Sequence, residues 1–73
     1  MAKRCITNNI RTLRFHHGEM TQKELADKVG VTRQTIIAIE KAKYSPTLEL
    51  AFQISLIFGE PLHEVFAYEE VEE

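Results

Sequence analysis

The amino-acid sequence predicts a single all-α domain of five helices. Apolar residues recur at helical spacing in five separate stretches, and threonine or glycine residues stand where these helices would start or end. With 73 residues, the chain is long enough for one domain, residues 1–73. A domain of this size buries only about 60% of the surface that its unfolded chain exposes, so contact with a second chain would stabilise it.

The first helix is expected to run from about Ile6 or Asn8 to His16. Ile6, Ile10 and Leu13 recur at positions i, i+4 and i+7, which places them on one helical face. Asn8 is a candidate N-terminal cap for this helix, because its side chain can bond a free backbone N–H.

The second and third helices carry start and stop signals. Thr21 and Glu24 form an S/T-x-x-E capping box, in which each side chain bonds the other residue's backbone N–H. Gly30 ends the second helix, because glycine tolerates the left-handed conformation at this position. Thr32 can then cap a third helix that covers Arg33 to about Lys41.

The fourth helix is expected between a cap at Thr47 and a stop at Gly59. Apolar residues surround most of it, so it is either central or covered on one side by another chain. One apolar face carries Leu48, Ala51, Phe52, Ser55 and Phe58. The other apolar side carries Leu50, Ile54 and Ile57.

A short fifth helix should follow Pro61, whose ring suits the first turn of a helix. Leu62, Val65 and Phe66 would form its apolar side. The tail from Ala67 to Glu73 alternates only weakly between apolar and acidic residues. It is either frayed or a short strand that pairs only in a dimer.

Composition excludes several classes of protein. The mean hydropathy is −0.23, and no run approaches the roughly 20 apolar residues of a membrane span. No apolar segment of a signal peptide follows the charged N-terminus, so a soluble cytoplasmic protein is expected. Cys5 is the single cysteine, which excludes an internal disulfide and argues against a thiolate metal site.

Charge is distributed unevenly along the chain. Nine basic and four acidic residues lie at or before position 43, a formal charge of +5. From position 44 onward seven glutamates and no lysine or arginine give −7. This polarity indicates a basic contact surface at one end of the domain, although a dipolar surface that contacts only solvent would have the same charges.

The stretch TQKELADKVGVTRQTIIAIE, residues 21–40, is typical of a helix-turn-helix. Ala26 is small where two helices would cross, and Gly30 starts the turn. Val31 fills the space beneath that turn, while Ile36 and Ile39 anchor the next helix. In such a motif, which here covers about residues 21–41, the second helix enters the DNA major groove.

These residues resemble the helix-turn-helix family of phage Cro and repressor proteins and the xenobiotic-response-element regulators, especially its small stand-alone members. The resemblance covers Ile10 to Phe66, through LR, MTQKELA, VGVTRQTIIAIE, SPTLELA and FGEPLHEVF. It implies a five-helix, lambda-repressor-like domain that binds operator DNA as a homodimer, with one recognition helix per half-site. Two departures are a turn lengthened at Gly18-Glu19, and Lys41-Ala42-Lys43 in place of the usual Asn-Gly-Lys.

The resemblance also implies roles for single residues. Gln22 corresponds to a glutamine that contacts phosphate and braces the recognition helix. Arg14 and Glu40 correspond to an internal ion pair between the first and third helices. The positions that approach base edges are Thr32, Arg33, Gln34 and Ala38.

A helical wheel of the third helix gives independent support. With Ile36 and Ile39 directed inward, the outward residues are Gln34, Ile37, Ala38 and Lys41. Ile37 then contacts either a thymine methyl group or the side of the fourth helix, with equal weight. The full set of expected DNA contacts is Thr21, Gln22, Thr32, Arg33, Gln34, Ile37, Ala38, Lys41, Lys43 and Tyr44.

Catalytic and metal-binding patterns are not found in the sequence. His16, His17 and His63 lack a neighbouring cysteine or carboxylate cluster at ligand spacing. No nucleophile with its base, phosphate-binding glycine loop or catalytic carboxylate pair is recognisable. An enzyme is therefore not expected, nor is a metal ion, a cofactor or a small-molecule ligand.

The sequence thus predicts a sequence-specific DNA-binding transcriptional regulator, acting as a repressor and as a homodimer on double-stranded DNA. The dimer region should lie at about residues 54–70. Its expected contacts are Ile54, Ile57, Phe58, Leu62, Val65, Phe66 and Tyr68. The alternative is an antitoxin-like or other protein-interaction module that uses the acidic C-terminal end.

Overall fold

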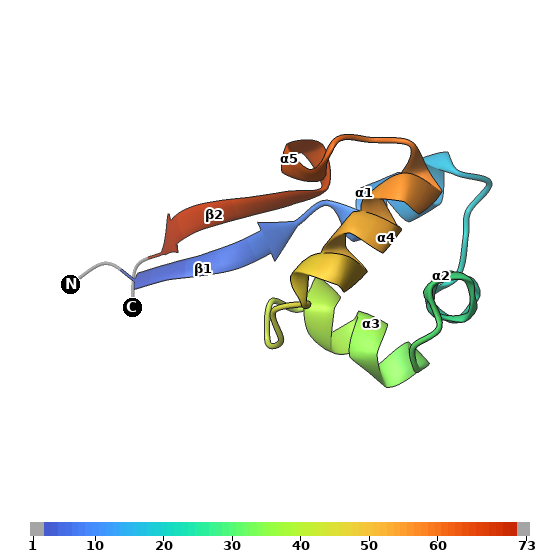
Figure 1. The fold of residues 1–73 in the computed structure, drawn as a ribbon, viewed down its shortest axis with the longest axis horizontal. Coiled ribbons are helices and arrows are strands. Elements are labelled where there is room, and N and C mark those ends of the chain that lie inside the picture. The colour runs from blue at the N-terminus through green and yellow to red at the C-terminus, as the bar shows by residue number, and fades with distance from the viewer. Residues whose placement is uncertain (1–2, 72–73) are drawn as a thin grey trace.

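The computed structural model describes residues 3–71 and consists of a helical body and a two-stranded ribbon. The elements in chain order are β1 (Lys3–Asn8), α1 (Ile10–His16), α2 (Gln22–Val29), α3 (Arg33–Glu40), α4 (Leu48–Phe58), α5 (Leu62–Val65) and β2 (Phe66–Val71). The helices gather at one end, and the ribbon extends away from them toward both termini (Figure 1).

The ribbon corrects the all-α prediction. β1 and β2 pair antiparallel within one chain, in the register Lys3↔Val71 to Asn8↔Phe66. Ile6 therefore lies opposite Tyr68 in the ribbon, and the first helix begins only at Ile10. The C-terminal tail is neither frayed nor a strand that pairs only in a dimer, because its partner is the chain's own N-terminal strand. Pairing satisfies backbone groups that a frayed tail would leave to water.

The caps predicted for α2, α3 and α4 are confirmed. The N–H of Glu24 donates to Thr21 Oγ1 over 3.0 Å, and the N–H of Thr21 donates to Glu24 Oε1 over 2.9 Å. These hydrogen bonds, foremost the one from the Thr21 backbone, lower the pKa of Glu24 from its ordinary value of 4.5. Thr32 and Thr47 cap α3 and α4 through their side-chain oxygens, which accept from the N–H groups of Thr35 and Leu50. The N-cap position of α1 is Asn9, without a side-chain bond, and the predicted cap Asn8 lies one position earlier, where its Oδ1 accepts from the N–H of Ile10 over 3.2 Å.

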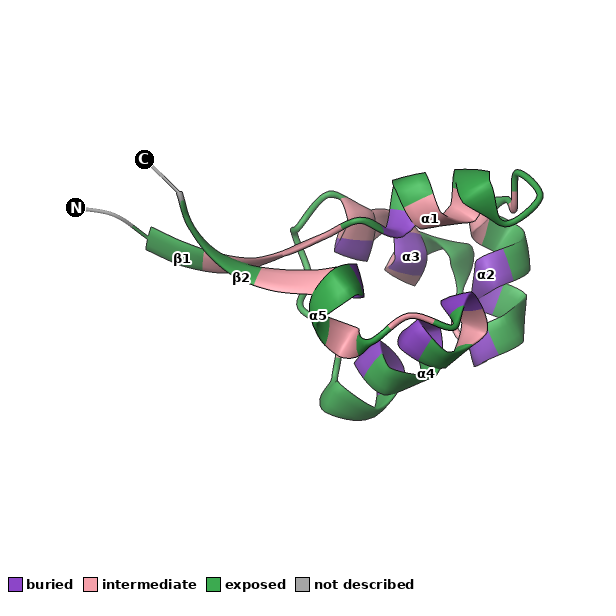
Figure 2. Cartoon of the chain, turned by 90° about the horizontal axis from the view of Figure 1, so that it is seen from above, coloured by how far each residue is buried: buried purple, intermediate pink, exposed green. Residues whose placement is uncertain are grey.

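The core lies where the helices face one another (Figure 2). Its largest fully buried side chains are Ile10, Leu25, Ile36, Ile39, Ile54 and Val65. On α4 both apolar faces contribute to the core. Ala51, Ser55 and Phe58 are buried from one face, and Leu50 and Ile54 from the other. Leu48 and Phe52 are instead 66% and 50% exposed. Both sides of this helix are apolar, so its periodicity alone could not decide which side the other helices cover.

The longest helix, α4, has 11 residues. Within residues 3–71, no helix has the length and apolar character required to cross a bilayer. Cys5 lies in the ribbon as a free, half-buried thiol.

Candidate nucleic-acid interface

The α2–turn–α3 unit has the packing of a helix-turn-helix. Gly30 adopts a left-handed φ of 75°, and the next N–H, of Val31, donates to the carbonyl of Ala26 over 3.0 Å. Ala26 is buried on α2, and Ile36 and Ile39 fix α3 from the inside. The opposite side of α3 is consequently left for contact with other molecules.

The outward side of α3 carries the residues predicted to read bases. Arg33 and Gln34 are exposed at its start, and Ile37 and Ala38 are half-buried further along. Lys41 follows directly after the helix and is exposed. Ile37 lines the same groove as Arg33 and Lys41, so its side chain can contact a molecule that binds in the groove.

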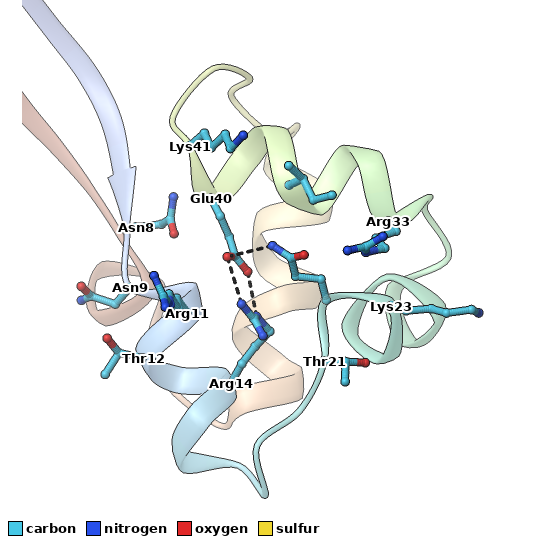
Figure 3. A pocket seen from close by; sticks show the side chains of 12 residues that line it. Asn8, Asn9, Arg11, Thr12, Arg14, Thr21, Lys23, Arg33, Glu40 and Lys41 are labelled. Carbon is cyan, nitrogen blue, oxygen red and sulfur yellow. Dashed lines mark hydrogen bonds and ion pairs between the residues drawn. The ribbon is translucent and has the colours of Figure 1, made fainter.

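An open groove of about 890 Å³ lies between α1, the start of α2 and α3 (Figure 3). It brings together residues that are far apart in the sequence. They are Asn8, Asn9, Arg11, Thr12, Arg14, Thr21, Gln22, Lys23, Arg33, Ile37, Glu40 and Lys41. α1, the start of α2 and the face of α3 that carries Arg33, Ile37 and Glu40 therefore share one concave surface.

The Arg14–Glu40 ion pair lies in the middle of this groove. Arg14 Nε donates to Glu40 Oε2 over 2.7 Å, and Nη2 donates to Oε1 over 3.0 Å. Nη1 donates to the carbonyl of Met20 over 2.8 Å, and Gln22 Nε2 donates to Glu40 Oε1 over 3.3 Å. The side chains of Arg14 and Glu40 are only 14% and 10% exposed, so this bidentate pair ties α1 to α3 from within.

The remaining charges of the groove are positive. Glu40 is the one carboxylate among the lining residues, all of which lie within residues 3–71, and Arg14 neutralises it. Lys23 pairs with Asp27 over 3.1 Å. Across the described part of the chain, Arg11, Arg33 and Lys41 have no ion-pair partner. The groove therefore attracts a polyanion.

The loop after α3 places two further predicted contacts beside the groove. Ala42 has a left-handed φ of 58°, and its N–H donates to the carbonyl of Ile39 over 2.9 Å. The N–H of Lys43 donates to the carbonyl of Ala38 over 2.9 Å. This tight turn holds exposed Lys43 and Tyr44 close to the end of α3, outside the groove itself.

Two predicted contacts have their hydroxyl groups occupied by capping. Thr21 Oγ1 accepts from Glu24, and Thr32 Oγ1 accepts from the N–H of Thr35 over 3.3 Å. Thr21 lines the groove, whereas Thr32 does not. Their first role is thus to start the two helices.

Sequence reasoning missed five residues of the groove, namely Asn8, Asn9, Arg11, Thr12 and Lys23. Arg11 could have been predicted from the sequence, because it stands three positions before Arg14 and therefore shares a helical face with it. Asn8 and Asn9 could not be recognised, because their position depends on the strand that ends beside them.

The predicted dimer residues do not all lie on the surface. Ile54, Phe58 and Val65 are 0%, 3% and 0% exposed, because the chain's own helices enclose them. Their assignment to a dimer contact is therefore wrong. Ile57, Leu62 and Phe66 are half-buried and Tyr68 is exposed. A separate apolar pocket of about 250 Å³ is lined by Ile6, Pro46, Leu48, Ala51, Leu62 and Phe66.

The contacts of His17 are with backbone carbonyls and an aromatic ring. Within residues 3–71, no three His, Cys, Asp or Glu side chains are grouped closely enough to hold a metal ion. The ring nitrogens of His17 lie 2.8 and 3.0 Å from the carbonyl oxygens of Leu13 and Phe58, and its ring meets the Phe58 ring edge-on. This histidine links the ends of α1 and α4.

Comparison with known proteins agrees with this geometry. The family model described as helix-turn-helix matches residues 10–65. An uncharacterized HTH-type transcriptional regulator of Methanocaldococcus jannaschii is 51% identical over 65 residues, which cover 89% of this chain and 97% of that protein. The transcriptional repressor RstR of a cryptic CTXphi phage in Vibrio cholerae is 33% identical over 64 residues, which cover 88% of this chain and 57% of RstR.

A solved structure has the same fold. The crystal structure of a putative DNA-binding protein from Bacteroides fragilis superposes with a TM-score of 0.72 at 18% identity, covering 85% of this chain and 98% of that one. Together with the groove and the sequence relatives, these matches show that the chain belongs to the Cro/C1-type helix-turn-helix family of DNA-binding transcriptional regulators.

Proposed function

We propose that the protein is a repressor that binds a specific operator as a homodimer, with α3 in the major groove of each half-site. The observation that carries this proposal is the groove around the buried Arg14–Glu40 pair. All its unpaired charges, within the described chain, are positive, and one side of it is the solvent-facing side of α3. A helix about 10–12 Å wide fits a major groove about 12 Å wide.

Sequence would be read by three residues of α3. Gln34 can make a bidentate pair with adenine and Arg33 with guanine, each worth about 1–3 kcal/mol of discrimination. Ile37 can contact a thymine methyl group, which its half-buried position in the groove favours over a purely lateral role. Ala38 adds no bulk, so the helix can approach the base edges closely.

The homodimer would form over the apolar pocket beside the ribbon. Leu48 is largely exposed there, and Leu62 and Phe66 line the pocket with Ile6. An exposed apolar surface of this kind is more stable when a second copy covers it. Since Pro46 and Leu48 follow the loop after α3, two-fold pairing here would bring the ends of both α3 helices to the same side. Half-sites would then lie about 34 Å apart.

The repressor role is supported by one relative. RstR is named as a transcriptional repressor and is similar to this chain over residues that include the whole helix-turn-helix. A bound dimer would repress by occupying the operator, without a ligand.

DNA titrations over a range of salt concentrations test the binding function. Affinity should fall steeply as salt rises, because each neutralised phosphate releases counterions. An affinity that stays flat with salt and is equal for all duplexes would contradict the proposal.

Equilibrium sedimentation tests the dimer. The wild type should sediment as a dimer, and Leu62→Glu as a monomer because it places a charge in the apolar pocket. Leu56→Glu is the matched control, since Leu56 is 79% exposed and does not line that pocket. A monomeric wild type at tens of micromolar, or equal effects of the two variants, would contradict the proposed surface.

The acidic C-terminal end gives little support to the alternative protein-interaction function. Glu69 Oε2 accepts a hydrogen bond from Thr7 Oγ1 over 2.8 Å, and Glu70 pairs with Arg4 over 3.5 Å. Both glutamates therefore have partners inside the ribbon. A function that used only the acidic end would also leave the positive groove unexplained.

A further inference from the structure

The helix α1 carries the exposed cation Arg11 at the edge of the groove, and neither the fold nor the base contacts of α3 involve this side chain. We propose that α1 is a second contact with DNA, in which the guanidinium of Arg11 binds a backbone phosphate beside the major groove that α3 enters. This inference rests on the proposed operator binding and adds to it a contact outside the helix-turn-helix.

The position of Arg11 follows from that of Arg14. The two arginines stand one helical turn apart on the same face of α1. Arg14 is directed into the domain, where Glu40 and the carbonyl of Met20 occupy its guanidinium. Arg11 is exposed and lines the groove from the α1 side, whereas Arg33 lies on the α3 side (Figure 3).

The charge of Arg11 is available for a ligand. Within residues 3–71 its guanidinium has no ion-pair or hydrogen-bond partner, and the one carboxylate in the groove, Glu40, is already paired. A guanidinium presents five donors in a planar fork that matches two phosphate oxygens. Thr12 is also exposed and lines the groove, so α1 presents a second donor to the same groove.

A phosphate, and not a base, fits this position. One helix already fills the width of a major groove, so α1 cannot enter beside α3. A side chain on the adjacent helix therefore meets the sugar–phosphate backbone that borders the groove. Such a contact fixes the orientation of the protein on the duplex and is the same for every sequence.

The test compares salt dependence among matched variants. Affinity is measured against salt concentration for the wild type, Arg11→Ala, Arg11→Lys and Lys28→Ala, on the preferred duplex and on one of unrelated sequence. Lys28→Ala is the control, because it removes the same charge from an exposed site on α2 that does not line the groove. Thermal unfolding of each variant checks that the exposed substitutions leave the fold intact.

We expect Arg11→Ala to reduce the slope of log affinity against log salt by about 0.9 per bound subunit. It should weaken both duplexes by the same factor, while Arg11→Lys and Lys28→Ala keep the wild-type slope. A steep wild-type slope that Arg11→Ala leaves unchanged overturns the α1 contact alone. A loss confined to the preferred duplex also overturns it, because that result indicates a base contact. A wild type without salt-dependent binding overturns both this inference and the proposed function.

Discussion

The side-chain amide of Asn8 donates a hydrogen bond to the carbonyl oxygen of Ile39 over 2.8 Å. Its own oxygen accepts from the N–H of Ile10 over 3.2 Å. The carbonyl of Ile39 belongs to the last turn of α3, and it also accepts from the N–H of Ala42 over 2.9 Å. One side chain at the end of β1 thus joins the ribbon, the start of α1 and the end of the recognition helix.

The variant Asn8→Asp should destabilise the fold by about 1–2 kcal/mol, because it keeps the acceptor for Ile10 but removes the donor to Ile39. Urea unfolding measures this change in the free energy of unfolding. Asn9→Asp is the control, since the side-chain amide of Asn9 donates to the backbone carbonyl of Glu64 at an exposed site and the loss of this bond should cost less. Equal losses in the two variants would contradict the role given to Asn8.

The variant Glu40→Gln should destabilise the fold by about 3 kcal/mol, because it leaves the guanidinium of Arg14 in its enclosed site without a counter-charge. Chemical denaturation measures the effect. Asp27→Asn is the matched control, since it breaks an exposed pair with Lys23 and should cost less than about 1 kcal/mol. If Glu40→Gln costs no more than this control, the buried pair does not hold α1 and α3 together.

The variant Ala42→Gly should stabilise the fold by about 1 kcal/mol, because Ala42 occupies a left-handed conformation with a φ of 58°. Glycine adopts this conformation without the penalty of a Cβ atom. Thermal unfolding should show a higher midpoint for the variant. A lower midpoint would mean that the entropy lost by glycine on folding exceeds the strain relieved.

The capping box should make the free energy of unfolding depend on pH in the acidic range. Its hydrogen bonds lower the pKa of Glu24 in the folded protein, so the ionised carboxylate contributes stability above the ordinary value of 4.5. That contribution is lost as the pH falls through the lowered folded pKa. The difference in unfolding free energy between the wild type and Glu24→Gln should therefore be largest near neutral pH and shrink below about pH 4.5. A difference that grows toward acid pH would contradict this assignment.

The variant Gln34→Ala should change which operators are preferred, because Gln34 is exposed on the base-reading side of α3. Lys43→Ala should weaken all duplexes alike, since Lys43 lies beside the groove in the turn after α3. Binding to a panel of single-base operator variants separates the two outcomes. A uniform loss with Gln34→Ala would remove it from the base contacts.

Local signals in the sequence were sufficient for the helix-turn-helix. Thr21 and Gly30 act through bonds to residues a few positions away, so their patterns define the ends of α2 without knowledge of the rest of the fold. The Arg14–Glu40 pair could be anticipated only through the family resemblance, since 26 positions separate the two residues.

The ribbon and the surface of α4 could not be predicted in this way. Ile6 and Tyr68 pair across the length of the chain, and no pattern near either residue identifies the other. On α4 the series Leu48, Phe52 and Leu56 has the same period as Leu50, Ile54 and Phe58. Only the packing of neighbouring helices decides that the second series is buried. For this reason the sequence alone assigns Ile54 and Phe58 to the dimer contact, although they belong to the core.

The most direct test of the central claim is the affinity of the wild type for a duplex selected from a random pool, compared with a scrambled duplex of equal composition at one salt concentration. If α3 reads base edges, the selected duplex should contain two related half-sites about one helical turn apart. It should bind about 10³-fold more tightly than the scrambled one. Equal affinities for the two duplexes would contradict a sequence-specific role for the groove.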